Sequence, residues 1–448
     1  MKVVRYVLVA VGLFAANPLL AEPIDLTSAY QKALEYDARL RVAKAENLIY
    51  KEEIGKAKSQ LLPNVYLNAG RGRNATQHGY MGRFYPIDYY DTVNFGFSVR
   101  QTLFNFSSLS SYKQAKLVSA KSDIDLQKEE GEVMIRITEA YCNALYAEDN
   151  LKFSNVLIKA TQEQLRQAKQ RFKKGFGTII EIEEAQAACD NAEADGVEIA
   201  NSVEFSRCEL EDLTGSYPEE LCAIAPEKLR LARPEQDVDW WIERARSSSY
   251  VVAAARQEIL IAKKDIDKQR ATRYPTIDLV GGRNYSESEN NYSIGSIYNT
   301  YSIAIQLSMP TYTGGYTGAA IRQAKAKWSK AGEQLTLQER EVESEVRKYY
   351  NGVVSTLSLI KAYEQSVKSR EIALIGTKKG YQAGLRSNVE VLDAEQKLFA
   401  SKRNLAKSRY QYLINELMLK KTAGILSIAD ITEVNSWLAG TPQEKSQP

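Results

Sequence analysis

The feature that most constrains the fold of this chain is an internal duplication. When Pro63 is laid on Pro275, a shift of 212 residues, many positions before these prolines carry the same residue in the two halves. These pairs include Ala33/Ala245, Ala43/Ala255, Glu46/Glu258, Ile49/Ile261, Lys51/Lys263 and Ile54/Ile266. A repeat of this length indicates that the same arrangement of helices and strands occurs twice in the chain. We therefore expect the second half to fold like the first.

Each half begins with a helix and continues with strands. The apolar spacing of residues 22–58 predicts a helix that starts after a cap at Asp25 or Thr27 and is stopped by Pro63. Alternation of apolar and polar side chains then predicts strands with two different faces. Residues 71–91, rich in Gly, Arg and Tyr, are expected to form an exposed loop. The four predicted strands are at about residues 64–70, 92–101, 275–284 and 298–308.

Two very long helical hairpins follow the strands, at about residues 107–213 and 318–424. The helical pattern from 107 to 171 is unbroken, which corresponds to about 95 Å at 1.5 Å per residue. In the second hairpin, apolar residues recur every seven positions, and this period predicts a left-handed supercoil against a neighbouring helix. These residues are Val346, Val353, Ile360, Val367, Leu374 and Tyr381.

The same turn sequence ends both hairpins. Residues 171–185 repeat the aromatic, glycine, hydroxyl and acid positions of residues 380–394 at a shift of 209. Gly380 and Gly384 break the helical pattern, and Ser387 or Asn388 is expected to cap the next helix. Each tip also carries two acids three residues apart, which places both carboxylates on one face of the helix.

The chain divides into five segments on these patterns. A basic start, a short apolar run and small residues at its end predict a secretory signal, because the run is shorter than the roughly 20 residues that span a bilayer. The end of the chain is polar and is expected to be disordered. The predicted segments are the signal (1–21), the first repeat (22–215), a connector or equatorial segment (216–239), the second repeat (240–425) and a C-terminal equatorial segment with a polar tail (426–448).

Composition argues against several function classes. With 59 basic and 56 acidic side chains, the chain is nearly balanced in charge, and nothing favours nucleic acid as a partner. The single histidine, His78, lies in the predicted loop, and no catalytic set or phosphate loop is encoded, so we expect no enzyme, cofactor or metal site. Cys208 and Cys222 flank a turn and are expected either to form a disulfide or to remain two reduced thiols.

The strands set the architecture if this chain enters a membrane. No segment after the signal is long and apolar enough to be a spanning helix, so insertion must use strands. Four strands cannot close, and an open edge is not tolerated in lipid, so a barrel must be shared between chains. Two chains would give eight strands and a barrel filled by its own side chains, whereas three would give twelve and a lumen. We therefore expect a homotrimer, continued by a helical tube of roughly 100 Å.

Several motifs resemble those of the TolC family of outer-membrane channel proteins. They are the tips Arg171-Phe172-x-x-Gly175 and Gly380-Tyr381-x-x-Gly384, the run Glu390-Val391-Leu392-Asp393-Ala394 and the block Arg409-Tyr410-Gln411-Tyr412-Leu413-Ile414-Asn415-Glu416-Leu417. The resemblance covers nearly the whole mature chain. It implies a mainly α fold with membrane β: a trimeric 12-strand outer-membrane β-barrel continued by a periplasmic α-helical coiled-coil barrel. It also implies docking on a periplasmic adaptor and an inner-membrane ABC or RND-type pump, for type I secretion or drug efflux.

The resemblance implies an acidic ring at the periplasmic aperture. Glu390 and Asp393 match the acidic positions of the family, so three copies would place six carboxylates around a narrow pore. Such a ring favours cations and is expected to be blocked by multivalent ones. The alternative from the residues alone is an ordinary solvated helix start, where acids suit the helix dipole.

The resemblance further implies a lock and a docking surface at the tips. Glu181, Tyr381 and Arg386 match positions that hold the aperture shut, and a bond from Glu181 to Arg386 would join the two tips of one protomer. Two departures from the family are Ile180, where a hydroxyl residue is expected, and Lys378, where an acid would meet Gln164. The adaptor is expected to dock at the tips, at Gly175 and Gly384.

A second interpretation is a periplasmic coiled-coil adaptor or a structural scaffold without a pore. Adaptors also carry long hairpins, but neither alternative would need four alternating strands with tyrosine-rich loops. The cargo is not encoded in the sequence, because Arg100 and Asp278 are too sparse a lumen charge to choose between protein toxins and small drugs.

Overall fold

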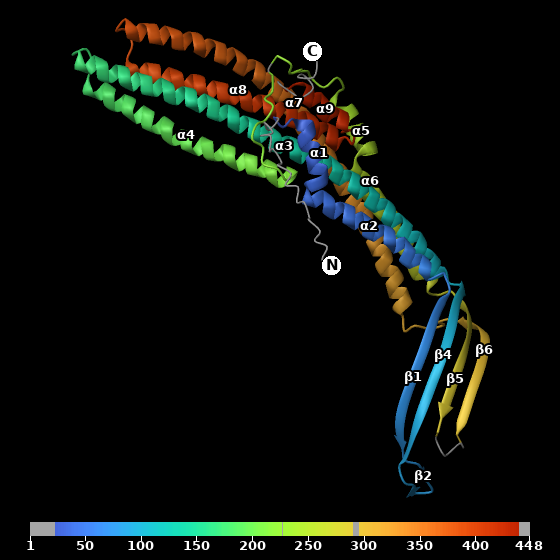
Figure 1. The fold of residues 1–448 in the computed structure, drawn as a ribbon. Coiled ribbons are helices and arrows are strands. Elements are labelled where there is room, and N and C mark those ends of the chain that lie inside the picture. The colour runs from blue at the N-terminus through green and yellow to red at the C-terminus, as the bar shows by residue number, and fades with distance from the viewer. Residues whose placement is uncertain (1–22, 226, 290–294, 439–448) are drawn as a thin grey trace, which may run out of the picture.

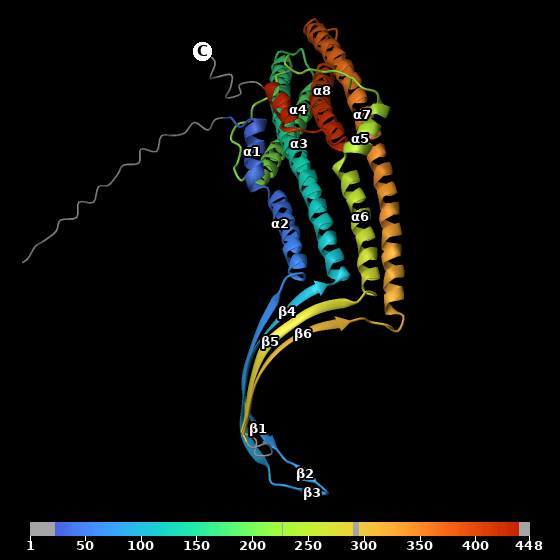
Figure 2. The same cartoon turned by 90° about the vertical axis from the view of Figure 1, so that its right-hand side faces the viewer.

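The computed structural model describes residues 23–225, 227–289 and 295–438. The predicted signal at 1–21 and the polar tail from 440 to 448 lie outside the described residues, as do residues 290–294 of the loop expected before the fourth strand. The molecule is elongated, with a curved sheet at one end and long helices running away from it (Figures 1 and 2).

The elements of the first half lead from short helices through the sheet to the first hairpin. They are α1 (Leu26–Tyr36), α2 (Ala38–Ser59), β1 (Asn64–Thr76), β2 (Gly79–Tyr80), β3 (Arg83–Phe84), β4 (Asp88–Phe104), α3 (Phe106–Lys173) and α4 (Ile179–Thr214). The second half repeats this course and ends in one extra helix. Its elements are α5 (Val238–Ser248), α6 (Tyr250–Ala271), β5 (Thr276–Ser288), β6 (Ser296–Ser308), α7 (Tyr316–Gln382), α8 (Asn388–Thr422) and α9 (Ile428–Ser436).

The duplication is visible in the positions of these elements. α1, α2 and β1 each begin and end 212 residues before α5, α6 and β5. The hairpin α3–α4 has its counterpart in α7–α8, and the two hairpins lie side by side with their tips at the end of the molecule farthest from the sheet (Figure 1). The two tips are therefore close together in space although 209 residues separate them in the sequence.

Asp37 ends the first helix and starts the second. The sequence predicts one helix over residues 22–58, and this was wrong, because the structure divides it into α1 and α2. The Asp37 carboxylate accepts a hydrogen bond from the backbone N–H of Leu40 at 2.9 Å and so caps α2. Arg136 of α3 donates to the same carboxylate at 2.9 Å and to Glu129 at 2.9 Å. A single Asp inside a helical pattern is a weak stop signal, so the break depends on this tertiary contact.

The long helices pack along their predicted apolar stripes. Of the six residues spaced by seven in α7, Val346, Val353, Ile360 and Tyr381 are buried and the other two are partly covered, mainly by packing between α7 and α8. The core lies at the middle of the molecule, where α1, α5 and α9 meet the long helices; Trp241, Tyr141 and Leu438 are among its buried side chains. Among the described residues, none of the helices combines the length and apolar character needed to cross a membrane.

The sheet has four antiparallel strands in the order β1-β4-β5-β6. Within the described part of the chain, β1 and β6 have no further strand partner, so both edges are open. The register places alternate residues of all four strands on the same face. One face is apolar and carries Val65, Leu67, Phe95, Phe97, Ile303, Ile305 and Leu307, whose exposed fractions lie between 41% and 79%. The other face carries small and polar residues, among them Asn68, Ser98, Arg100, Asp278, Ser302 and Gln306.

The strands extend beyond the ranges that the sequence predicts, and the exposed loop expected at residues 71–91 is mostly strand. β1 continues to Thr76 and β4 starts at Asp88, and a short β2–β3 hairpin lies between them. The alternation of apolar residues stops at about residue 70, but the ladder goes on because cross-strand polar pairs replace it. Arg71 pairs with Asp91 at 3.0 Å, for example.

The two cysteines that flank the turn do not form a disulfide. Cys208 is exposed on α4, whereas Cys222 is buried in the connector, where its backbone N–H donates to the carbonyl O of Ile24 at 3.2 Å. Of the two expected outcomes for Cys208 and Cys222, the structure therefore shows two separate thiols.

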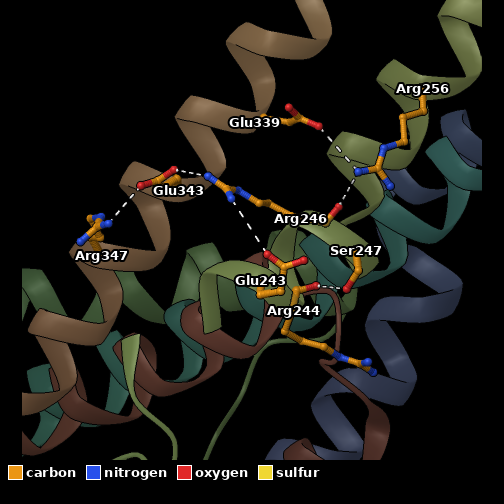
Figure 3. A network of polar contacts seen from close by, with 8 residues as sticks. All are labelled: Glu243, Arg244, Arg246, Ser247, Arg256, Glu339, Glu343 and Arg347. Carbon is orange, nitrogen blue, oxygen red and sulfur yellow. Dashed lines mark hydrogen bonds and ion pairs between the residues drawn. The ribbon is translucent and has the colours of Figure 1, made fainter. Parts of the chain in front are cut away.

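The second half has a corresponding joint between α5 and α6, equivalent to the break between α1 and α2. Exposed ion pairs hold these two helices to α7 (Figure 3). Arg246 lies 2.9 Å from Glu343, which also pairs with Arg347 at 3.0 Å. Arg256 of α6 pairs with Glu339 of α7 at 3.6 Å and donates to the carbonyl O of Arg246 at 3.0 Å. The two halves therefore fasten the same joint differently, with a buried carboxylate in the first half and a solvated network in the second.

We predict that Arg136→Gln destabilises the protein by about 3 kcal/mol, because it leaves the Asp37 carboxylate, which is 2% exposed, without its cation. Burial acts to raise the pKa of Asp37, but the Leu40 N–H and the bond and charge of Arg136 outweigh it and lower the pKa. The contribution of Asp37 is therefore present above its unfolded pKa of about 3.9 and is lost as the pH falls through the lower native pKa. Urea denaturation followed by circular dichroism measures both effects. Arg246→Gln, at a 47% exposed side chain, is the matched control and should change stability little; equal losses would contradict the distinction.

Candidate aperture at the two hairpin tips

Both tips are closed by the same backbone turn. In the first, the N–H of Phe176 donates to the carbonyl O of Arg171 at 3.0 Å, and in the second the N–H of Leu385 donates to the carbonyl O of Gly380 at 2.8 Å. The turns need a residue in the left-handed region, with φ of 77° at Gly175 and 75° at Gly384. This is the Schellman ending of a helix, for which glycine is favoured because it has no Cβ.

The returning helices also begin alike. The side chain of Thr178 accepts from the backbone N–H of Glu181 at 3.2 Å, and that of Ser387 accepts from the N–H of Glu390 at 3.3 Å. At the second tip the Glu390 carboxylate also accepts from the backbone N–H of Ser387 at 3.3 Å, which completes a capping box. Of the two caps considered from the sequence, the cap is therefore Ser387, and Asn388 is fully buried instead.

The two acids of the predicted ring are exposed on the first turns of α8. Glu390 is 43% and Asp393 53% exposed, and each pairs with a base four residues away, Glu390 with Arg386 at 2.6 Å and Asp393 with Lys397. The Arg386 guanidinium, helped by the backbone and hydroxyl of Ser387, holds the pKa of Glu390 below its ordinary value. Glu390 therefore stays ionised to lower pH than a free glutamate.

The structure does not bring Glu181 and Arg386 together, because Arg386 pairs with Glu390 instead. Glu181 folds back over its own turn, where one carboxylate oxygen would lie 3.2 Å from a Cβ placed on Gly177, and this oxygen is buried without a hydrogen bond among the described residues. The two tips are therefore not joined by the expected bond between Glu181 and Arg386.

At the tips, the contact that joins the two hairpins is between Arg171 and Tyr381. The Arg171 guanidinium lies over the Tyr381 ring, 4.7 Å from its centroid, and the tyrosine is 5% exposed. Burial is the main cause that raises the pKa of Tyr381, and the nearby Glu181 adds to it, whereas the Arg171 charge opposes it. The ring therefore stays neutral and presents its face to the cation, an arrangement worth roughly 1 kcal/mol or more when water is excluded.

The two departures from the family pattern have different surroundings. Ile180 is 64% exposed at the first tip. Lys378 lies 2.7 Å from a carboxylate oxygen of Glu395 on α8, so it forms an ion pair inside its own hairpin, although neither Glu395 oxygen has a well-aligned hydrogen bond. Gln164 is buried in α3.

Sequence reasoning named Arg171 in the first tip motif but gave it no role, and it missed Glu395. The signal for Arg171 is a difference between the repeats, because the equivalent position of the second tip is Gly380. The signal for Glu395 is an acid three residues after the buried Leu392, at a position that is itself 5% exposed.

Comparison with known proteins gives the same picture of the fold. The profile of a family described as outer membrane efflux protein matches residues 29–216 and 241–425, one match in each half. The chain is 31% identical to outer membrane protein TolC of Vibrio cholerae, over 92% of this chain and 94% of that protein. It is 32% identical to the alkaline protease secretion protein AprF of Pseudomonas aeruginosa, over 91% and 86%. The CmeC outer membrane channel of Campylobacter jejuni superposes with a TM-score of 0.77 at 16% identity, over 93% and 90% of the two chains, and confirms the predicted fold class.

We predict that the Arg171–Tyr381 contact depends on the ring and not on the hydroxyl. Tyr381→Phe should leave hydrogen exchange of the tip amides unchanged, because the Tyr381 hydroxyl has no hydrogen-bond partner among the described residues. Tyr381→Leu should raise exchange of residues 171–176 and 380–385 by about fivefold, since it removes roughly 1 kcal/mol of cation–ring attraction. Amide hydrogen exchange read by mass spectrometry measures this. Faster exchange in Tyr381→Phe would show that the hydroxyl carries the contact.

Proposed function

This chain belongs to the outer membrane efflux protein family, and from that premise we propose that three copies form an outer-membrane exit duct. The duct passes substrates from an inner-membrane pump and its adaptor to the exterior, and the periplasmic helical end opens like an iris. The family is one of transport proteins, and we propose that this member has no enzymatic activity.

The observation that carries the proposal is a sheet with two different faces and two open edges. A face of exposed Leu, Ile, Val and Phe side chains suits lipid, and the small and polar face suits a water-filled lumen. The unpaired N–H and C=O groups of β1 and β6 need partners in lipid, and another copy of the same sheet provides them. Twelve strands from three copies would leave a channel. A scaffold or adaptor in water would gain nothing from such a sheet.

The order of the helices also supports a closed barrel, because it is the same as the order of the strands. The elements attached to β1, β4, β5 and β6 are α2, α3, α6 and α7, and these four helices contact one another in that order. The outer helices expose apolar side chains, with Ile49 at 61% and Leu48 at 64% on α2, and Leu337 at 53% and Trp328 at 45% on α7. We propose that α2 of one copy packs on α7 of the next and so continues the barrel as a helical tube.

We also keep the predicted division of the chain as a proposal, with the connector (216–239) and the C-terminal segment (426–448) as an equatorial belt around the tube. Two contacts support it. The N–H of Ala225 donates to the carbonyl O of Trp437 at 2.9 Å, and the N–H of Ile24 donates to that of Glu220 at 2.9 Å.

We propose that Glu181, Tyr381 and Arg386 belong to the lock of the aperture, now with Arg171 as a fourth member. The Arg171–Tyr381 contact ties α3 to α7, and Arg386 orders the acid at the start of α8. Opening the iris would move one hairpin tip against the other, and breaking this contact at the tips costs little compared with unfolding a helix.

An adaptor is proposed to dock at the tips, at Gly175 and Gly384. Each glycine is followed by an apolar residue that is largely exposed, Phe176 at 77% and Leu385 at 82%. Apolar side chains at the ends of rigid hairpins suit a helical partner that packs against them. The names of the relatives range from protease secretion to cation efflux, so the cargo and the class of pump, ABC or RND-type, stay open.

The first test of the duct is its assembly. We predict that protein extracted from membranes with detergent migrates as a trimer that heating converts to a monomer, and that it conducts ions in planar bilayers. Both follow from edges that are satisfied only between copies. A stable monomer that stays dissolved in buffer without detergent would contradict the proposal.

The second test concerns the ring of Glu390 and Asp393. Their surface ion pairs with Arg386 and Lys397 are weak in water, so a multivalent cation at the pore axis competes for the carboxylates of three copies. We predict that a trivalent cation added from the side of the tips blocks the current, and that Glu390→Gln with Asp393→Asn abolishes this block. The lowered pKa of Glu390 means that block persists below the ordinary glutamate pKa of about 4.3.

The matched control is Glu183→Gln with Glu184→Gln, which removes the same charge from the other tip, on α4. This control should still be blocked. Block that is equally strong in both double variants would remove the acidic ring from the proposal.

A further inference from the structure

Arginines interrupt the apolar face of the sheet toward the end that lies away from the helices. In β1, Val65, Leu67 and Ala69 are followed on the same face by Arg71, and in β5 Ile277, Leu279 and Gly281 are followed by Arg283. Arg71 and Arg283 are equivalent in the duplication, since 212 residues separate them as they separate β1 from β5. In a closed trimer, which the proposed function provides, they would form six arginines at one height of the barrel. Arg73 lies two residues beyond Arg71 on the same face.

This height is near the boundary of the apolar band. Six residues separate Val65 from Arg71, which corresponds to about 20 Å along a strand and about 16 Å along the axis of a barrel whose strands tilt by roughly 40°. The apolar band of such barrels is about 25 Å tall. The arginines therefore lie in its upper part, on the side away from the helices, and their side chains reach outward to the headgroups.

The charges are not balanced within the chain. Arg71 and Arg73 share the single carboxylate of Asp91, at 3.0 and 4.0 Å. Arg283 donates to the neutral amide oxygen of Asn299 at 2.9 Å and lies 5.5 Å from the centre of the Tyr301 ring. The other acid on this part of the face, Glu287, accepts from the Tyr285 hydroxyl at 2.7 Å. Within the described strands, three guanidinium groups thus face two carboxylates, and the side chains of Arg71 and Arg73 are 76% and 79% exposed.

The opposite face shows how an arginine is placed when it has no outside ligand. Arg100 lies on the small and polar face and pairs with Asp278 at 3.1 Å, whose side chain is 14% exposed. On the apolar face, an arginine among Leu, Val and Phe is costly in lipid unless an anion meets it. A planar guanidinium presents paired donors that match the oxygens of a phosphate group.

We propose that Arg71, Arg73 and Arg283 form a binding site for the phosphorylated headgroup of an outer-leaflet lipid. The occupant is a lipid with phosphate monoesters, because its acyl chains lie on the apolar band below while its phosphates meet the arginines above. Tyr285 and Tyr301, on the same face, provide the amphipathic rings that suit this interface. The inference rests on the proposed trimeric duct, which turns the arginine-bearing face toward the lipid.

The test uses the trimeric protein in nanodiscs that contain equal amounts of diphosphorylated lipid A and the same lipid with its phosphates removed. Native mass spectrometry of lipid that stays bound gives the ratio of the two. The expected result for the natural chain is at least about fivefold more of the phosphorylated form. The variant with Arg71→Gln, Arg73→Gln and Arg283→Gln should bring the ratio close to one. Inorganic phosphate added to the buffer should not displace the lipid, because the acyl chains hold it in place.

The control variant is Arg100→Gln, which removes the same kind of charge from the other face of the sheet and should keep the full ratio. The single variant Arg283→Gln is compared directly with the control variant Arg100→Gln. A ratio near one in the natural chain, or an unchanged ratio in the triple variant, would overturn the site. Bilayer conductance of every variant separates this from the duct: channels without lipid selection refute only the lipid site, whereas absence of channels in the natural chain refutes the duct.

Discussion

The structure depends on the backbone groups at the two edges of one sheet. β1 and β6 are each thirteen residues long and have no strand beyond them in the described chain. An unpaired backbone group in lipid costs several kcal/mol, and in the proposed duct these edges are closed by other copies. The helices that enter and leave the strands keep the order of the strands, and closing the sheet therefore also closes the helical wall. The tips, farthest from the sheet, are the part of the wall that edge pairing constrains least.

Much of this could be predicted from the sequence because the strongest signals are periodic. The duplication, the residues spaced by seven in α7 and the alternation in the strands are patterns that burial or a lipid-facing surface imposes on many residues at once. They predict the fold class, which the solved relatives confirm. Contacts made by one residue leave no period. The break at Asp37 and the strand extension through Arg71 and Asp91 each depend on a partner distant in the sequence, and sequence reasoning missed both.

The candidate site shows the same limit of prediction from sequence, here at the level of single side chains. The glycines and caps of the tips could be predicted because turn geometry restricts residue type locally. The partner of Arg386 could not, because Glu181 and Glu390 occupy equivalent positions after equivalent caps and nothing local says which of them the guanidinium meets. In the structure, Arg386 pairs with Glu390, an acid one turn away in the same segment, a short-range pair that needs no second hairpin. At the tips, the link between the hairpins is left to Arg171 and Tyr381.

The positions where the two halves agree and differ follow from what each end of the molecule has to do. Lipid would surround the proposed barrel on all sides, so side chains that face it would gain from being the same in both repeats, as Arg71 and Arg283 are. An iris has the opposite requirement. If the two tips of a protomer made identical contacts, the contacts within a protomer would be the same as those between neighbouring protomers. A hairpin could then not move within its protomer without the same movement between protomers. Arg171 has Gly380 as its counterpart, so among the described residues one cation–ring contact joins the two tips and not two. In the proposed trimer, three such contacts around the axis would allow alternate hairpins to move while the others stay, and this asymmetry is what a gate built from a duplicated chain needs.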